Sequence, residues 1–296
     1  MDLSTFITAV FCLADDWLRE QESPRRRGPA PELSDSEVLT IEIVGEFLGI
    51  DAEKSIYTYF RRHYGEWFPA LCRVHRTTFT RQMANLWALK RKLWRELLDW
   101  IGFDPEVSLI DSFPLPVCRF ARAYRCHVLA EECAFGYDEV SKQTFYGLRA
   151  HLQVAWPGVI VGVDLAPADA HDLHLAQEML LEEDPKKGWV LGDRNYWSPR
   201  LAEHLEERGL RLLAPYKSKK GERKPWPRWL VQKRRRIETV ISQLVERYGA
   251  KKVWARDRWH LTSRWLRKVL SHTVSFCLCQ RAELSSPLRF AELVTN

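Results

Sequence analysis

Two short apolar runs, each ending in an aspartate, decide the fold of this chain. The first is VSLID at residues 107–111, and the second is WVLGD at residues 189–193. Nearly continuous apolar runs of this length predict strands covered on both faces, as in the middle of an α/β sheet. Ligands of such sheets gather at the carboxyl ends of the strands. We therefore expect Asp111 and Asp193 to lie near each other at that end of the sheet.

A third carboxylate, Glu238, stands on a predicted helix. Apolar residues recur there at the spacing of one helix face, at Ile237, Ile241, Leu244 and Tyr248. Hard divalent cations take oxygen ligands, and two ions about 4 Å apart can hold the attacking and leaving oxygens of a phosphodiester. Asp111, Asp193 and Glu238 are therefore the predicted catalytic residues and the predicted ligands of two Mg²⁺ or Mn²⁺ ions. The plain alternative is that the aspartates are turn residues and that Glu238 is a first-turn acid favoured by the helix dipole.

The order of predicted elements is that of a ribonuclease-H-like α/β fold. The predicted strands cover residues 107–111, 145–155, 159–165, 189–193 and 210–215. Predicted helices over 172–182 and 199–208 separate the later strands, and the Glu238 helix follows them. This order predicts a mixed five-stranded sheet flanked by helices. Residues 112–144 are expected to form an irregular insertion, and residues 265–279 a helix that packs on the sheet.

Residues 1–102 form the predicted N-terminal domain, which is helical throughout. Its predicted helices cover residues 3–18, 34–49, 54–64 and 78–100. Ser34 and Glu37 make a capping box at the start of the second helix. Arg61 and Arg62 suit a helix-turn-helix-like DNA-binding domain, with a helical cap that touches no base as the alternative. Residues 103–296 are assigned to the catalytic domain.

The positive charge of the chain is concentrated in residues 217–236. The whole chain carries a net charge of +6, and this stretch alone has ten Lys or Arg and one acid. Crowded cations beside a predicted metal site favour a polyanion, so we expect DNA contacts here, with a solvated charge run as the alternative. The predicted contacts are Lys217, Lys219, Lys220, Arg223, Lys224, Arg234, Arg235 and Arg236. Trp226 and Trp229 are expected to stack on bases at an opened DNA end, or else to cover the sheet edge.

Several other polar residues have simpler roles open to them. The run DAHDLH at 169–174 contains Asp172, which is expected to cap a helix rather than to bind a metal. Arg149 and His151 lie on the predicted hairpin, where alternation does not tell which face they take. Asp164, on the second arm of that hairpin, is the carboxylate most easily mistaken for a catalytic one.

The seven cysteines do not suggest a disulfide framework, because their number is odd and their spacing irregular. Cys118, Cys126, His127 and Cys133 are close enough in sequence to raise a structural zinc site. No Cys-x-x-Cys pair is present, however, so we expect reduced, partly buried thiols.

Four stretches of the chain resemble bacterial insertion-sequence transposases of the DDE type. They are LIDSFP at 109–114, FYGLRAHL at 145–152, LGD at 191–193 with Tyr196, and RRRIE at 234–238. The resemblance implies a ribonuclease-H-like core in which Asp111, Asp193 and Glu238 are the DDE carboxylates. Arg234 matches an arginine that relatives often carry four residues before the glutamate. Val231 and Val245 stand where many relatives have Tyr and Lys, so the phosphate-contact roles of those two residues are not transferred.

The resemblance implies DNA transposition. The implied activity is binding to the terminal inverted repeats of an insertion sequence, followed by metal-dependent cleavage and strand transfer to target DNA, without a nucleotide cofactor. Joining two DNA ends needs two active sites, so a homodimer on DNA is expected. The alternatives are a ribonuclease-H-like nuclease, an inactive DNA-binding relic and a helix-turn-helix transcription factor.

Composition points to a soluble protein, with 46% hydrophobic and 28% charged residues. Residues 1–18 contain three aspartates and no basic region, so no signal peptide is expected. The longest uncharged apolar stretch near the end, residues 269–279, is too short to span a bilayer. We expect a cytoplasmic bacterial protein that associates with the nucleoid when it binds DNA, and no membrane partner.

Overall fold

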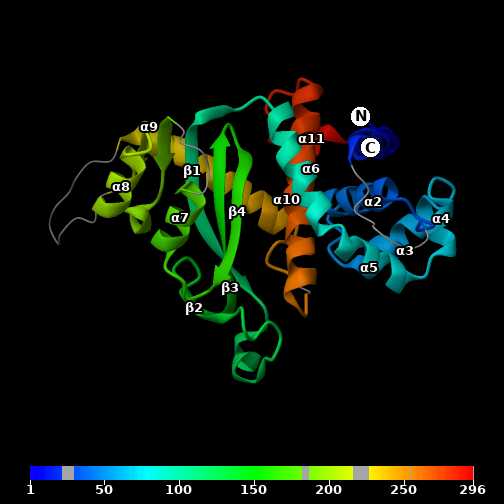
Figure 1. Cartoon of the computed structure of the whole chain (residues 1–296), viewed down its shortest axis with the longest axis horizontal. Coiled ribbons are helices and arrows are strands. Elements are labelled where there is room, and N and C mark those ends of the chain that lie inside the picture. The colour runs from blue at the N-terminus through cyan, green and yellow to red at the C-terminus, as the bar shows by residue number, and fades with distance from the viewer. Residues whose placement is uncertain (22–29, 182–186, 216–226, 254, 296) are drawn as a thin grey trace. The chain divides into compact units, whose positions relative to one another are not determined.

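The structure is a computed structural model that describes residues 1–21, 30–181, 187–215, 227–253 and 255–295. The chain forms two compact units, which are drawn in Figure 1. The helical unit comprises Met1–Ile101, Leu244–Ala250 and Trp254–Asn296, and the sheet unit comprises Gly102–Gln243 and Lys251–Val253. None of the helices in the described part of the chain has the length and apolar character that a membrane crossing requires.

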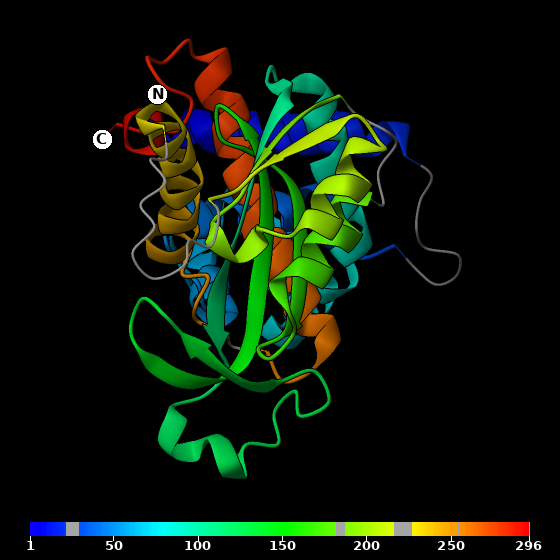
Figure 2. The same cartoon turned by 90° about the vertical axis from the view of Figure 1, so that its left-hand side faces the viewer.

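The described residues of the sheet unit contain six strands, one more than expected (Figure 2). They are β1 (Asp104–Pro116), β2 (Ala134–Asp138), β3 (Gln143–Trp156), β4 (Val159–Pro167), β5 (Gly188–Leu191) and β6 (Leu210–Leu213). The strand order is β2-β3-β1-β5-β6, and β4 also pairs with β3. β5 is parallel to β1 and β6, whereas β3 is antiparallel to β1, β2 and β4. This mixed sheet flanked by helices is the expected ribonuclease-H-like fold.

The additional strand, β2, lies in the segment that the sequence predicted to be irregular. Residues 112–144 first extend β1 to Pro116, then form the 3₁₀ helix η1 (Phe120–Arg125), and then form β2. β2 pairs with the beginning of β3, from Gln143 to Gly147. Its alternation covers only the five residues AFGYD, which is too short for the period of a strand to stand out in the sequence.

Helices cover the sheet around β1. The helices α7 (Asp172–Leu181) and α8 (Pro199–Glu206) join β1 and β5 in a core whose buried residues include Ile110, Ala176, Leu180, Val190, Tyr196, Leu201 and Leu205. A third helix, α9 (Arg228–Ser242), packs against β1. Neighbouring residues of a strand face opposite sides of the sheet. Ile110 accordingly enters the core with α7 and α8, while Asp111 contacts Arg234 of α9.

The helices of the helical unit are α1 (Leu3–Glu20), α2 (Asp35–Phe47), α3 (Glu53–His63), α4 (Pro69–Arg73), α5 (Arg76–Asn85), α6 (Trp87–Trp100), α10 (Arg258–Arg281) and α11 (Phe290–Leu293). The capping box of Ser34 and Glu37 starts α2, as predicted. The single helix expected over residues 78–100 is two helices, α5 and α6, which meet at Leu86. Lys90 donates a 3.0 Å hydrogen bond to the carbonyl oxygen of Met83, one of the last-turn carbonyls that a helix end leaves free.

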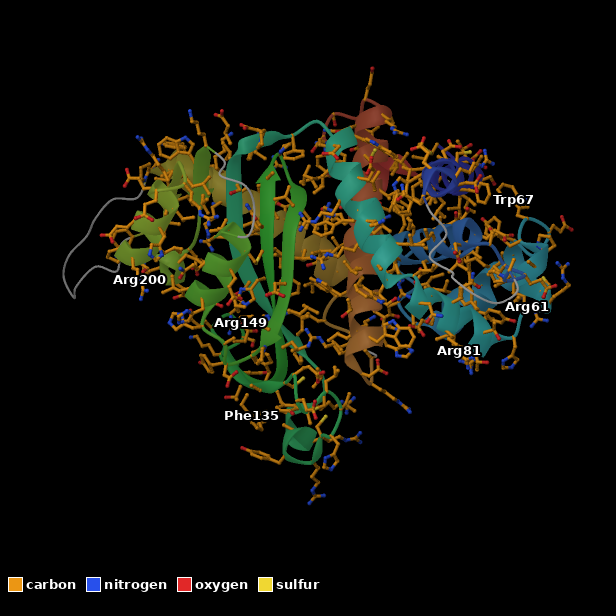
Figure 3. All side chains as sticks on the ribbon, in the orientation of Figure 1. Arg61, Trp67, Arg81, Phe135, Arg149 and Arg200 are labelled. Atoms are coloured by element: carbon orange, nitrogen blue, oxygen red, sulfur yellow. The ribbon has the colours of Figure 1, made fainter. Side chains whose placement is uncertain are left out.

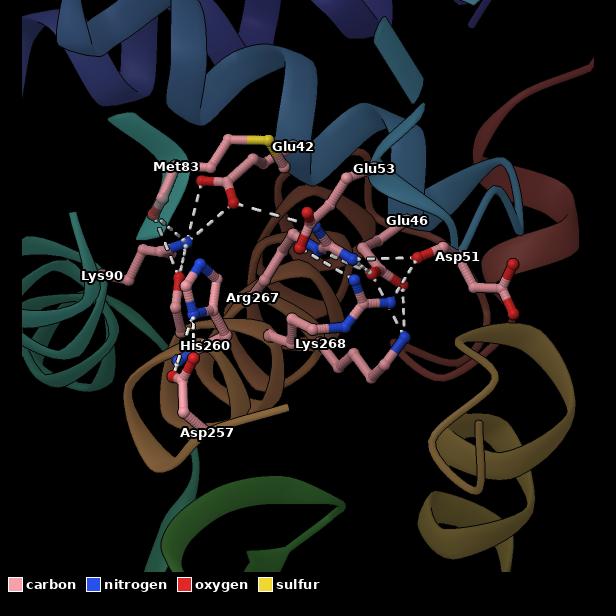
Figure 4. A network of polar contacts seen from close by, with 12 residues as sticks. Glu42, Glu46, Asp51, Glu53, Met83, Lys90, Asp257, His260, Arg267 and Lys268 are labelled. Carbon is pink, nitrogen blue, oxygen red and sulfur yellow. Dashed lines mark hydrogen bonds and ion pairs between the residues drawn. The ribbon is translucent and has the colours of Figure 1, made fainter. Parts of the chain in front are cut away.

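The long helix α10 belongs to the helical unit, so the expectation that residues 265–279 pack on the sheet was wrong. It contacts α2, α5, α6 and α11. Arg267 and Lys268 of α10 pair with the buried Glu46 of α2 at 2.6 Å and 2.9 Å (Figure 4). Buried charges are costly unless they are paired, so these contacts fix α10 on α2. The division of the chain therefore differs from one catalytic domain over residues 103–296, because the C-terminal helices lie in the helical unit.

Candidate active site

Asp111 and Asp193 lie close together where β5 ends beside β1. The last paired residues of the two strands are Leu109 and Leu191, and each aspartate follows its leucine by two residues. Burial raises the pKa of Asp111 to about 6; the charge of Asp193 acts in the same direction and that of Arg234 acts against it. The two predicted carboxylates are thus close enough to interact electrostatically, in a poorly hydrated part of the sheet unit.

Arg234 of α9 reaches the same place. Its Nη2 lies 3.4 Å from Oδ2 of Asp111, with the arginine side chain 30% exposed and the aspartate side chain 17% exposed. The Nε of Arg234 is buried and has no hydrogen-bond partner among the described residues. This arginine therefore offers a counter-charge to Asp111 and retains a donor that a bound group could use.

Glu238 lies one helical turn after Arg234 on α9, and its side chain is exposed. Within the described residues it forms no hydrogen bond or ion pair with Asp111 or Asp193. No three His, Cys, Asp or Glu side chains of the described chain are placed so that they could hold a metal ion. The structure therefore brings two of the three predicted carboxylates together and places the third on the helix that approaches them.

The donor chemistry of this place fits a hard divalent cation. Asp111 and Asp193 offer carboxylate oxygens, which Mg²⁺ and Mn²⁺ prefer. The raised pKa of Asp111 shows that its negative charge is poorly solvated by its present surroundings, where burial outweighs the nearby Arg234. A cation between the two aspartates would relieve that penalty.

Ser112 connects the two aspartates to a second group of polar residues. Its backbone N–H donates to Oδ1 of Asp111 at 2.8 Å, and its hydroxyl donates to Oδ1 of Asp172 at 3.3 Å. Arg149 donates to the same hydroxyl oxygen at 3.4 Å. The buried Tyr196 lies close enough to Ser112 to interact with it, and burial holds the pKa of this phenol well above its ordinary value. Ser112 is therefore the shared contact of β1, β3, α7 and η2 (Arg194–Tyr196).

Asp172 is a site residue to which the sequence assigned only a capping role. Its Oδ1 lies 3.9 Å from Nε of Arg149 and 3.8 Å from Nε2 of His151. Burial raises the pKa of Asp172, with Asp193 raising it further and Arg149 lowering it. The structure therefore places Asp172 within electrostatic reach of Asp193. No signal in the sequence shows this, because it depends on where α7 begins relative to the end of β5.

His151 is buried beside Asp172 and stays neutral. Its side chain is 2% exposed, and neither ring nitrogen has a hydrogen-bond partner among the described residues. Burial lowers the pKa of His151 to about 4, and the charge of Arg149 acts in the same direction. His151 pairs across the sheet with Ser112 on β1 and with Asp164 on β4. Register therefore places Arg149 and His151 on the side of Ser112, a question that alternation left open.

A family model decides what this sheet unit is. The model of the transposase DDE domain matches residues 102–251, just over half of the chain. The chain belongs to the transposase DDE domain family. The matched residues contain Asp111, Asp193 and Glu238, together with every residue of the Ser112 group.

One solved structure that resembles the chain is a cryo-EM structure of the piggyBac transposase synaptic complex with hairpin DNA. It has 12% sequence identity and a TM-score of 0.47 over 97% of this chain and 76% of that chain. No curated protein sequence matches the chain.

Some of the predicted DNA-contact residues lie on α9, in the described part of the DDE domain. Trp229 and Arg235 of α9 are exposed, and Trp229 shows 59% of its surface. Arg236 lies 5.0 Å from the ring centre of Trp156, and Lys233 lies 3.6 Å from it. Arg236 therefore also packs α9 onto the turn between β3 and β4, a role that the charge pattern did not reveal.

The remaining predicted contacts are divided between the helical unit and the undescribed chain. Arg61, which is labelled in Figure 3, and Arg62 are exposed on α3. Arg61 donates to the hydroxyl of Tyr57 at 3.3 Å. The predictions that lie outside the described residues are Lys217, Lys219, Lys220, Arg223, Lys224 and Trp226.

The cysteines are free thiols. Burial raises the pKa of Cys133 to about 12, which keeps it protonated at neutral pH.

Proposed function

We propose that this protein is the transposase of a bacterial insertion sequence, which binds the terminal inverted repeats, cuts the DNA there and joins the cut ends to target DNA. The observation that carries the proposal is the meeting of Asp111 and Asp193 at the carboxyl ends of β1 and β5 within a transposase DDE domain. Paired carboxylates in that position suit the metal-assisted phosphodiester chemistry of this fold.

Asp111, Asp193 and Glu238 would hold two Mg²⁺ or Mn²⁺ ions. When bound, such ions would polarise the phosphate and make a nearby water more acidic. Arg234 would share the charge of Asp111 and turn its free Nε donor toward the phosphate. Ser112 would keep the carboxylate of Asp111 oriented through its 2.8 Å backbone hydrogen bond.

DNA binding is supported by exposed cations in both units. On α9 they include Arg228 and Arg235, and on α3 they include Arg61 and Arg62. Arginines at helix surfaces neutralise backbone phosphates and so supply affinity before any base is read. Two DNA ends need two such sites, so the working form on DNA is a homodimer.

The test is cleavage of the DNA that flanks the gene for this protein. The purified full chain is incubated with that DNA and Mg²⁺ or Mn²⁺, and nicks are mapped to single nucleotides. Asp193→Asn removes one charge at the site, and Glu203→Gln on the exposed surface of α8 is the matched control. We expect cuts at the element ends with the wild type and the control, and none with Asp193→Asn, although it still binds the duplex.

Other results would point to the other functions. Cleavage of RNA–DNA hybrids without preference for element ends would identify a ribonuclease-H-like nuclease. Tight, metal-independent duplex binding without any cut would identify an inactive relic or a transcription factor. Loss of both cutting and binding in Asp193→Asn would show that this variant is misfolded, which circular dichroism would detect.

A further inference from the structure

The insertion between β1 and β3 carries a group of exposed aromatic side chains. The exposed fractions are 45% for Phe120, 83% for Tyr124, 40% for Phe135 and 52% for Tyr137. We call these four residues the aromatic patch; Phe135 is labelled in Figure 3. Large aromatic rings usually bury most of their surface, so several exposed together indicate a surface that binds something.

The fold of β2 holds two members of the patch on one side. Alternation along the strand puts Phe135 and Tyr137 on the same face. The opposite face is closed at Gly136, where a Cβ atom would lie 2.7 Å from the Cβ of Ala168. Phe135 rests on its cross-strand partner Tyr146, with ring centres 5.0 Å apart. Neighbouring residues of the sheet unit therefore pack against β2 and leave the face with Phe135 and Tyr137 exposed.

The 3₁₀ helix η1 brings the other two rings onto the same surface. The ring centres of Tyr124 and Phe135 are 5.1 Å apart, and those of Phe120 and Phe135 are 6.3 Å apart. Phe120 and Tyr124 are 6.5 Å apart in an edge-on arrangement. Because the three rings contact one another, the patch is already formed without a ligand and little side-chain freedom is lost on binding.

Three arginines line one side of η1. A 3₁₀ helix has three residues per turn, so Arg119, Arg122 and Arg125 follow one another along the same side. All three are exposed, and none forms an ion pair with a carboxylate among the described residues. The sequence has no acidic residue between Asp111 and Glu131. Positive charge is thus placed directly beside the exposed rings.

We propose that the aromatic patch binds unpaired nucleotides of a DNA strand. The bases stack on the rings, and Arg119, Arg122 and Arg125 contact the phosphates. Every base has an aromatic face, so this binding tolerates any sequence, and each stacked base strengthens it about 5- to 150-fold. The inference rests on the proposed function, because cutting DNA at an element end is what exposes single strands to this protein.

A second copy of this protein would suit the aromatic patch less well than a DNA strand does. Symmetric association places the same surface on both sides of the contact. It would bring six arginines against one another without intervening acids on η1. A polyanion removes that repulsion, whereas a second copy creates it.

The experiment measures the affinity of the full chain for a fluorescently labelled oligo-dT strand at several salt concentrations. One variant combines Phe120→Ala, Tyr124→Ala and Phe135→Ala, and another changes the three arginines to Gln. Trp189→Ala is the matched control, because this ring is exposed on β5 outside the patch.

The two variants should fail in different ways. The aromatic variant should bind the strand at least about tenfold more weakly with an unchanged salt dependence, because stacking releases no counterions. The arginine variant should lower the slope of log affinity against log salt by about 2, since each phosphate contact on a single strand contributes about 0.7. Trp189→Ala should match the wild type in both respects.

Cleavage at element ends, measured on the same preparations, separates this inference from the proposed function. If the wild type cuts the ends but both patch variants bind oligo-dT with wild-type affinity and slope, the inference is overturned and the proposed function stands. If the wild type cuts nothing, and the patch variants bind oligo-dT more weakly than the wild type does, only the proposed function fails. A patch variant that loses self-association in sedimentation but keeps oligo-dT binding would make the surface a protein interface and overturn the inference.

Discussion

The hydroxyl of Ser112 lies 3.3 Å from the carboxylate of Asp172, which is 60 residues further along the chain. Ser112 follows Asp111 directly, and Tyr196, which also contacts Ser112, stands three residues after Asp193. One serine therefore ties the turn that carries Asp193 to the strand that carries Asp111. Asp172 holds this serine in place and also faces Arg149 at 3.9 Å.

Removing Asp172 should impair cleavage more than folding. Asp172→Ala leaves Ser112 without its acceptor and Arg149 without its counter-charge. We expect cleavage to slow by about 10- to 100-fold and the requirement for Mg²⁺ to rise, as happens when residues that orient metal ligands are lost. The free energy of unfolding should fall by about 1–2 kcal/mol, since the side chains of Asp172 and Arg149 are both partly hydrated. Cleavage rates titrated with Mg²⁺ and a denaturant curve measure the two effects.

Two further variants make the Asp172 test specific. Asp172→Asn keeps an acceptor for Ser112 and should recover part of the rate. Asp169→Ala, at an exposed position three residues before α7 begins, is the control and should behave like the wild type. A fall in stability with an unchanged Mg²⁺ requirement would show that Asp172 acts only in folding.

Substituting Asp111 should stabilise the metal-free protein at neutral pH. The pKa of Asp111 is about 6 in the folded chain, against an ordinary 3.8. Between these values the folded state holds a proton that the unfolded state has released, so the contribution of Asp111 to stability falls as the pH rises. Asp111→Asn removes that loss and should be more stable than the wild type at pH 7.5 by about 1–3 kcal/mol, but not at pH 4.

Urea unfolding in EDTA at the two pH values measures this difference. Saturating Mg²⁺ should then stabilise the wild type more than it stabilises Asp111→Asn, because the variant has lost one of the three proposed carboxylate ligands. A variant that is less stable than the wild type at both pH values would contradict the predicted cost of burying this charge.

The strands of the site were predictable because burial on both faces leaves an apolar run in the sequence, as at residues 107–111 and 189–193. The contacts of Ser112 could not be predicted from the sequence. Its meeting with His151 depends on the register between β1 and β3, and its meeting with Asp172 depends on where α7 begins. Apolar periodicity likewise predicted that α10 is buried but not what it packs against, which is decided by Glu46 and its two cationic partners.

Substituting Gly192 should displace Asp193. A Cβ atom at this position would lie 2.8 Å from the Cβ of Tyr196, closer than real side chains approach. Tyr196 is buried in the core with α7 and α8, so the turn rather than the ring has to move. Gly192→Ala should abolish cleavage and cost about 1–3 kcal/mol of stability. Ala202→Gly on α8 is a control of similar size for stability alone, and normal cleavage by Gly192→Ala would show that the turn adapts.

Breaking the buried ion pair of the helical unit should be among the most destabilising single changes. Lys90 lies 2.7 Å from Glu42, and both side chains are 1% exposed. Lys90→Met leaves Glu42 buried without this partner and the carbonyl of Met83 without one donor. We expect a loss of about 3–5 kcal/mol in a thermal or urea melt. Arg91→Met, at the exposed neighbouring position, should change stability by less than about 0.5 kcal/mol.

The double variant tests the reason for that loss. Adding Glu42→Gln to Lys90→Met removes the carboxylate charge that has lost its lysine partner and should restore much of the stability. No recovery in the double variant would attribute the loss to packing alone.

The place of α10 has a consequence for the order in which this protein matures on the ribosome. The helices that precede β1 leave the ribosome long before Ser263, Arg267 and Lys268 have been added to the chain. Until then Glu46 lacks both of its cationic partners and Lys90 lacks the hydroxyl that it contacts at 2.8 Å. The first helices to be synthesised are therefore among the last to complete their contacts. The nascent chain cannot bind DNA with a fully folded helical unit before its active-site residues have been synthesised.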